Sequence, residues 1–114
     1  MKKNILTLVF LLASILTYAT GPKPQTVKIK TSAICEMCKA RIEKNLAFTK
    51  GVSDADLNLD DKVITVTFNP KKTSVDKIKQ AISEVGYDAD ELTANEKGYN
   101  KLPSCCKKDA EKHQ

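Results

Sequence analysis

The chain has 114 residues, a length that suits one small domain and excludes a second full one. Its content of 41% hydrophobic and 29% charged residues is that of a globular protein, and its single histidine excludes sites built from several imidazoles. The net charge of +5 would suit nucleic acid, but an aromatic content of 5% without Trp argues against a surface that stacks bases.

The first nineteen residues have the pattern of a cleaved export signal. Lys2 and Lys3 precede an uncharged apolar run that ends in 17–19, Thr-Tyr-Ala, with small residues where a signal peptidase requires them. The run is short for a membrane span, which needs about 20 residues. We therefore expect a signal peptide at 1–19, a linker at 20–25, and a periplasmic or secreted mature protein without stable membrane insertion. Loss of the two lysines lowers the net charge to about +3, too small an excess to indicate nucleic acid.

The next segments predict a strand followed by a helix. Residues 26–31 alternate between apolar and polar side chains, the pattern of a half-buried strand. From Glu36 the period changes, because three apolar residues recur at intervals of four, as on one face of a helix. These residues are Cys38, Ile42 and Leu46. The helix is expected to end before Gly51, since glycine readily takes the left-handed conformation.

The second half of the domain repeats this pattern after a hairpin. Residues 55–59 and 64–68 alternate again on either side of an Asp-Asp turn, which predicts two antiparallel strands. A second amphipathic helix is expected from a cap at Thr73 to its end at Gly86, and 87–92 should form a last strand. The order strand, helix, strand, strand, helix, strand predicts an α+β split βαβ fold. It has a four-stranded antiparallel sheet with both helices on one face.

The two cysteines after the first strand are the residues most suited to chemistry. Cys35 lies just before the helix and Cys38 in its first turn, where free N–H groups and the helix dipole favour thiolates. Lys39 and Arg41 add positive charge nearby. With two residues between them, both sulfurs can converge on one atom. Two thiolates without imidazole suit a soft ion such as Cu(I) or Hg(II), and leave Zn(II) short of its usual four ligands.

The same Cys-x-x-Cys spacing also serves two other purposes. One alternative is a periplasmic thiol–disulfide oxidoreductase, with Cys35 as nucleophile and Cys38 as resolving thiol. The other is a structural module in which the cysteines form only disulfides. A thioredoxin-like arrangement fits less well, because here a hairpin follows the first helix.

Three segments together resemble a known family, the heavy-metal-associated domain. They are Ile34-Cys35-Glu36-Met37-Cys38-Lys39, Gly51-Val52 and Gly86-Tyr87-Asp88-Ala89. The resemblance spans about residues 25–92, and it implies a ferredoxin-like βαββαβ sandwich whose metal ligands are Cys35 and Cys38. Copper metallochaperones, modules of copper-pumping P-type ATPases and exported mercury-binding proteins belong to this family.

Two positions near the site bear on this resemblance. Tyr87 falls where bacterial members often carry a Tyr that packs beside the metal loop without ligating. The family usually has Gly-Met-Thr before the first Cys, whereas this chain has Ser32-Ala33-Ile34. We therefore expect the small side chain of Ala33 to anchor the loop less firmly than the Met.

The polar segment 93–114 is expected to be a flexible tail, with a second pair of cysteines after a proline. Cys105 and Cys106 are adjacent, and adjacent cysteines form a disulfide only with strain. We interpret them as further candidate ligands for the soft metal, or as disulfide partners of Cys35 or Cys38.

The sequence thus predicts a monomeric, non-enzymatic metal carrier. The domain at 26–92 should capture Cu(I), or next Hg(II), and pass it to the thiol ligands of a membrane transporter or P-type ATPase.

Overall fold

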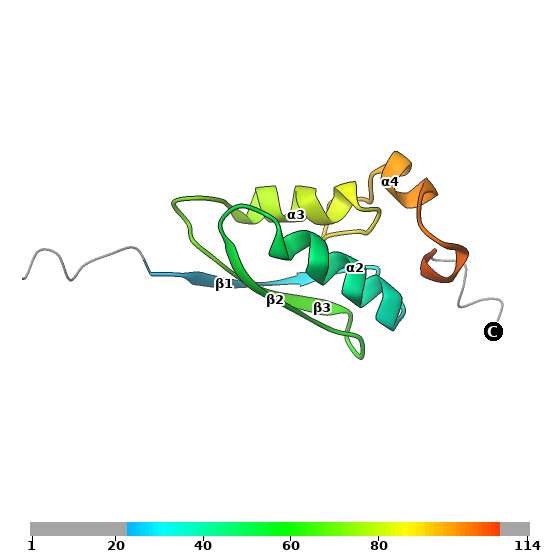
Figure 1. The fold of residues 1–114 in the computed structure, drawn as a ribbon, viewed down its shortest axis with the longest axis horizontal. Coiled ribbons are helices and arrows are strands. Elements are labelled where there is room, and N and C mark those ends of the chain that lie inside the picture. The colour runs from blue at the N-terminus through cyan, green and yellow to red at the C-terminus, as the bar shows by residue number, and fades with distance from the viewer. Residues whose placement is uncertain (1–22, 108–114) are drawn as a thin grey trace, which may run out of the picture.

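The computed structural model describes residues 23–107. Three strands form one antiparallel sheet in the order β1-β3-β2, and two helices cover one of its faces (Figure 1). The strands are β1 (Gln25–Lys30), β2 (Val52–Asn58) and β3 (Val63–Phe68), and the helices are α2 (Glu36–Ala47) and α3 (Val75–Glu84). The prediction of an α+β fold with both helices on one face is confirmed. The expected signal peptide at 1–19 lies outside the described residues, and within 23–107 no helix has the length and apolarity to cross a membrane.

The helix ends follow local chemistry. Gly86 follows the C-cap of α3 with a φ of +102°, and Gly51, with a φ of +88°, lies in the turn between the end of α2 and β2. The cap of α3 differs from the expectation by one residue. Ser74, rather than Thr73, accepts the hydrogen bond from the Lys77 backbone N–H at 3.3 Å.

The prediction of a fourth strand at 87–92 is wrong. This segment makes only isolated bridges, one between Ala89 and Thr31 and one between Ala89 and Leu92. The Ala89 and Leu92 backbones bond each other at 2.9 and 3.0 Å, so the chain reverses between them, and Asp90 adopts a φ of +52° in this turn. The Asp90 carboxylate accepts the Lys30 N–H at 2.8 Å, where a fourth strand would have offered a carbonyl. The Asp90 N–H also donates to the Lys30 carbonyl at 2.8 Å, so the segment meets the end of β1 at this point and then turns back instead of running along the strand.

The core lies between the sheet and the two helices. It includes apolar residues from every strand and from both helices, together with Tyr87, and all of them are almost fully buried. The helix residues Cys38, Ile42 and Leu46 are each 0% exposed, which confirms the predicted stripe. This packing fixes α2 on the sheet and so fixes the start of α2.

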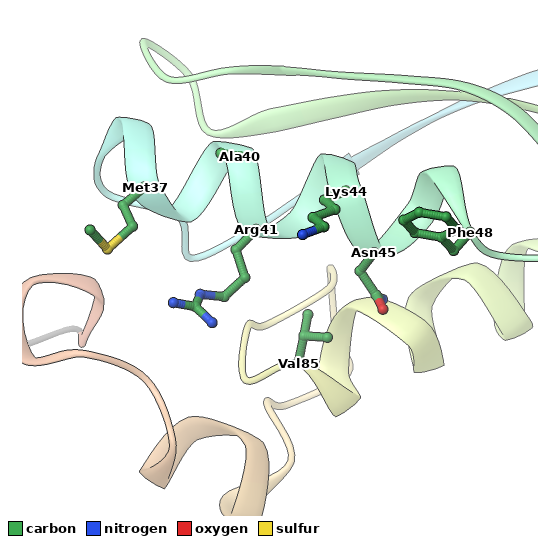
Figure 2. Close-up of a pocket in the computed structure, with 7 residues that line it drawn as sticks. All are labelled: Met37, Ala40, Arg41, Lys44, Asn45, Phe48 and Val85. Atoms are coloured by element: carbon green, nitrogen blue, oxygen red, sulfur yellow. The ribbon is translucent and has the colours of Figure 1, made fainter.

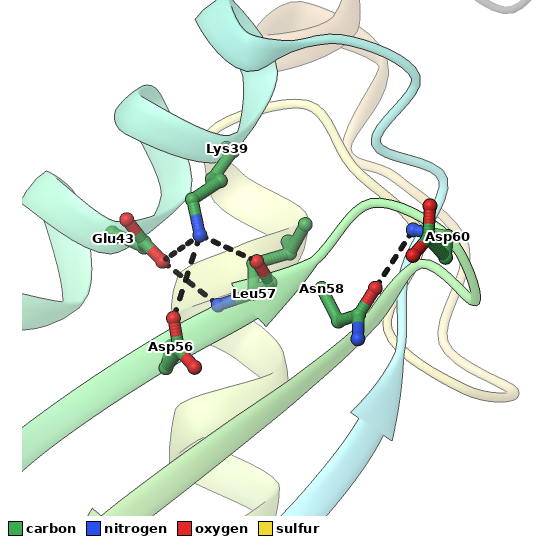
Figure 3. A network of polar contacts seen from close by, with 6 residues as sticks. All are labelled: Lys39, Glu43, Asp56, Leu57, Asn58 and Asp60. Carbon is green, nitrogen blue, oxygen red and sulfur yellow. Dashed lines mark hydrogen bonds and ion pairs between the residues drawn. The ribbon is translucent and has the colours of Figure 1, made fainter.

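A polar network beside the buried stripe of α2 connects this helix to strand β2 (Figure 3). The Lys39 ammonium contacts the Glu43 carboxylate at 3.3 Å, the Asp56 carboxylate at 3.4 Å and the Leu57 carbonyl at 2.6 Å. The Glu43 carboxylate also accepts the Leu57 N–H at 2.8 Å. These contacts fix the position of the first turns of α2 relative to strand β2.

The chain continues past the sheet as a packed segment. Helix α4 (Glu96–Asn100) and the 3-10 turn η2 (Ser104–Cys106) follow the turn at 89–92. Leu102 and Cys106 are only 5% and 2% exposed and belong to the core cluster. Figure 1 shows η2 beyond the end of the sheet where β1 ends and α2 begins. The part of the expected tail at 93–107 therefore has defined structure, because these two side chains are buried in the core.

Close backbone approach allows α4 to pack against the end of α3. A Cβ on Gly98 would lie 2.3 Å from the Glu84 carbonyl oxygen, and one on Gly86 would lie 2.7 Å from the Gly98 oxygen. The Asn95 N–H donates to the Ser83 carbonyl at 2.9 Å, which adds a backbone bond between the two helices. Only glycine at 86 and 98 permits this approach, and it directs the following residues toward α2.

Candidate metal centre

Helix α2 positions the first cysteine pair as expected. Cys35 is the N-cap residue, with extended backbone, and its carbonyl accepts the Lys39 N–H at 3.0 Å. Its side chain makes no capping hydrogen bond, so the sulfur is available to another partner. Cys38 is the third helical residue and is 0% exposed. Both cysteines therefore lie at the positive end of the helix dipole.

Hydrogen bonds hold the loop before Cys35. The Thr31 hydroxyl accepts the Ala33 N–H at 3.2 Å and donates to the Lys62 carbonyl at 2.9 Å. The Ser32 hydroxyl accepts the Asp88 N–H at 2.9 Å. Ala33 itself is fully buried. These hydrogen bonds hold the loop before Cys35 in place beside Ala33, whose small side chain was expected to anchor it only weakly.

The structure brings the second cysteine pair to the first. The Cys35 sulfur lies 3.3 Å from the Cys38 sulfur and 3.9 Å from the Cys106 sulfur. The Cys106 and Cys105 sulfurs are 4.0 Å apart, and those of Cys35, Cys105 and Cys106 all lie within 4.8 Å of one another. All four cysteines are free thiols. Segments about seventy residues apart in the sequence thus form one sulfur cluster.

Met37 adds a fifth sulfur at the edge of this cluster. The Cys105 thiol contacts the Met37 thioether at 3.7 Å, and both side chains are exposed. The sequence reasoning did not single out Met37 as a soft donor. Its place between the two cysteines was a signal, because a thioether shares the preference of thiolates for soft ions.

The buried thiols have perturbed acidities. Burial alone would raise the pKa of Cys38, but interactions with the Ile34 backbone, the Tyr87 hydroxyl and the Cys106 and Cys35 thiols together lower it. The pKa of Cys106 is raised to about 12, mainly by burial and also by the interaction with the neighbouring Cys38 sulfur. Cys38 is therefore the more readily ionised of the two.

Tyr87 lies beside these thiols, fully buried. Among the described residues its hydroxyl finds no hydrogen-bond partner of normal geometry. Burial raises its pKa, and the nearby Cys38 and Cys106 sulfurs raise it further. It is a neutral donor that faces thiols, and a thiolate at Cys38 would accept its hydrogen bond.

The two basic residues near the site have different roles. The Lys39 ammonium contacts Glu43, Asp56 and Leu57 on the β2 side (Figure 3), and the hydrogen bond that it donates to the Glu43 carboxylate raises its pKa. Its charge thus stabilises the helix–strand contact. Arg41 projects from the opposite flank of α2, beside Met37 (Figure 2).

The sequence signature of the heavy-metal-associated domain matches residues 26–88, which is more than half of the chain. The chain belongs to this family, and the predicted resemblance is confirmed.

Known relatives share both the sequence and the fold. The chain is 43% identical over 54 residues to the copper chaperone CopZ of Staphylococcus epidermidis, over 47% of this chain and 79% of CopZ. Its structure resembles the Cu(I)-loaded N-terminal domain of a potential copper-translocating P-type ATPase from Bacillus subtilis. The TM-score is 0.57 at 32% identity, over 60% of this chain and 86% of that one.

A third relative comes from mercury detoxification. The mercury-bound form of MerP, described as the periplasmic protein of a bacterial detoxification system, matches with a TM-score of 0.53 at 30% identity. The match covers 60% of this chain and 96% of MerP. Solved relatives thus hold Cu(I) or mercury, and the prediction of a soft metal as the ligand of this family is confirmed.

Proposed function

We propose that this protein is an exported carrier of a soft metal ion, Cu(I) first and Hg(II) next, that captures the ion with Cys35 and Cys38. The single observation that carries the proposal is the pair of sulfurs 3.3 Å apart at the N-terminus of α2. One thiol is part-exposed and the other is fully buried. The ion enters at Cys35 and is then bound by Cys38.

The surroundings of the pair support a thiolate-bound ion. The lowered pKa of Cys38 favours ligation, because the thiolate is the form that binds metal. The Tyr87 hydroxyl, which has no partner within residues 23–107, gains an acceptor when Cys38 carries a negative charge. A buried donor without a partner costs about 1–3 kcal/mol. A hydrogen bond from Tyr87 to a metal-bound Cys38 thiolate would remove this cost and so stabilise the ion-bound state.

A basic and apolar face beside the site supports transfer to a partner. Met37 in α2 and Phe48 at its C-cap are 50% and 83% exposed, and Arg41 and Lys44 lie between them along a shallow groove of about 480 Å³ (Figure 2). The residues that line this groove include no acid. We propose that a membrane transporter or P-type ATPase with thiol ligands docks here through an acidic surface.

The carrier transforms no substrate, since an incoming thiolate displaces Cys35 or Cys38 from the ion without any change of oxidation state. The proposed location is periplasmic or extracellular after cleavage of residues 1–19. It rests on the basic, apolar and small-residue pattern of that segment.

A transfer experiment tests the function. Cu(I)-loaded mature protein is mixed with an apo, soluble, thiol-bearing domain of a copper ATPase, and the copper in each is measured after ion-exchange separation. We expect rapid transfer, and slower transfer from Arg41→Glu. Lys28→Glu makes the same charge change at an exposed site on β1 and should transfer normally.

Two results would contradict the proposal. A protein that binds no copper but reduces insulin disulfides would be an oxidoreductase. One that binds copper but never releases it to a thiol domain would be a store rather than a carrier.

A further inference from the structure

The C-terminal segment is built to reach the metal loop. Backbone contact between Gly98 and Glu84 sets α4 against the end of α3, and the Asn95 carboxamide accepts the Gly98 N–H at 3.1 Å to begin that helix. Leu102 and Cys106 are then buried in the core. The position of Cys106 beside Cys35 therefore follows from packing along the whole segment.

The sulfur distances suit a metal ion with three ligands. Thiolates bind ions such as zinc at about 2.3 Å, so three sulfurs around one such ion stand about 4.0 Å apart. The Cys35–Cys106 and Cys106–Cys105 separations are 3.9 and 4.0 Å. The Cys35–Cys38 separation is 3.3 Å, well short of the roughly 4.6 Å that two opposed thiolates require at that bond length. The third pair, Cys35 and Cys105, lies within 4.8 Å, so small shifts would let all three sulfurs share one ion.

The three sulfurs also differ in access to solvent. Cys106 is 2% exposed, Cys35 is intermediate and Cys105 is exposed. The Met37 thioether lies 3.7 Å from the Cys105 sulfur at the outer edge. Sulfur donors therefore continue without a gap from the buried Cys38 to the surface.

We propose that Cys35, Cys105 and Cys106 form a second, three-thiolate position for the soft ion, which shares Cys35 with the capture pair. This inference rests on the proposed function, and it assigns the C-terminal segment a role in retaining the ion. The ion passes from Cys38 to Cys105 and Cys106 while it stays bound to Cys35. The segment then covers the ion until a partner thiol displaces it.

The exchange balances without any redox step. The bond from the ion to the Cys38 sulfur breaks, and bonds to the Cys105 and Cys106 sulfurs form. Two thiol protons are released, of which Cys38 takes one and solvent takes the other. Cu(I) remains Cu(I).

The experiment is X-ray absorption at the copper edge of the reduced mature protein with one equivalent of Cu(I), together with the rate of copper loss to an excess of a chromogenic chelator. The variants are Cys105→Ser, at an exposed position, and Cys106→Ala, which keeps an apolar side chain in the core. Ser104→Ala is the matched control in the same turn, because it changes no sulfur.

Three sulfur neighbours are expected in the wild type and in Ser104→Ala, and two in each cysteine variant. Loss of a ligand should speed copper release by at least about tenfold, on the scale of effects at metal sites. Two sulfur neighbours in the wild type, or equal release rates in all four proteins, would overturn the three-thiolate position and leave the carrier proposal intact. Absence of copper binding in every protein would overturn the carrier proposal instead.

Discussion

Gly98→Ala should release the C-terminal segment from the domain without unfolding the domain. The new Cβ would lie 2.3 Å from the Glu84 carbonyl oxygen and 2.9 Å from the Gly86 nitrogen. Both are backbone atoms at the end of α3 and cannot rotate away as a flexible side chain would. The strain must therefore be relieved by movement of α4.

The expected magnitude follows from two opposing terms. Overpacking of this kind costs about 1–3 kcal/mol. Docking of the segment buries Leu102, which is 5% exposed, and burial of a Leu side chain contributes about 1.5–3 kcal/mol. Because the overpacking cost cancels most of the docking free energy, the segment should be undocked for a large fraction of the time. The loss in free energy of global unfolding is limited to the docking term, about 2 kcal/mol.

Alkylation of the metal-free protein measures undocking directly. The rate at which iodoacetamide modifies Cys106 is followed by peptide mass spectrometry, with the exposed Cys105 as an internal reference. A docking term of about 2 kcal/mol corresponds to about thirtyfold faster modification of Cys106. Lys97→Ala alters an exposed neighbour in the same helix and should leave the rate unchanged. If Cys106 keeps its wild-type rate in Gly98→Ala while urea unfolds the protein much earlier, the reasoning is refuted, since α4 would then be part of the cooperative core.

Three further predictions concern stability and binding. Ser74→Ala should lower the free energy of unfolding by about 1 kcal/mol in urea, because the Lys77 N–H loses its cap; an unchanged midpoint would show that water replaces the hydroxyl. Tyr87→Phe should leave the metal-free protein at least as stable, since it removes an unpartnered hydroxyl, but should weaken Cu(I) binding in chelator competition; equal affinity would exclude a hydrogen bond to the Cys38 thiolate. The pKa of Cys106 is raised from 9.0 to about 12, so folding favours its neutral thiol. That stability is complete below pH 9.0 and is lost as the pH rises toward 12. Cys106→Ala should flatten this loss in urea unfolding of the metal-free protein across alkaline pH, and a profile identical to wild type would contradict the assignment.

The spacing of apolar residues predicted the helices and strands, because an element that buries one face must repeat apolar residues with its own period. Strands β1 and β3 and the apolar stripes of α2 and α3 follow the alternation and the four-residue spacing of the sequence. The fourth strand failed because short-range bonds decide segment 87–92. Asp90 bonds the Lys30 backbone and takes a positive φ, and no apolar pattern reveals such a turn.

The site was predictable only in part. The position of Cys35 and Cys38 at the start of a helix follows from local sequence. The approach of Cys105 and Cys106 depends on contacts between distant segments, above all the backbone contact at Gly98. Gly98 stands in a polar segment without apolar periodicity, so neither the helix it belongs to nor the burial of Leu102 could be inferred from pattern.

The most direct test of the central claim is a Cu(I) titration of the reduced mature protein against a chromogenic chelator. The wild type is compared with the double variant Cys35→Ser/Cys38→Ser, and circular dichroism checks that both are folded. We predict one tightly bound equivalent in the wild type and none in the folded double variant. Tight binding that survives in the double variant would contradict the assignment of Cys35 and Cys38 as the ligands that capture the ion.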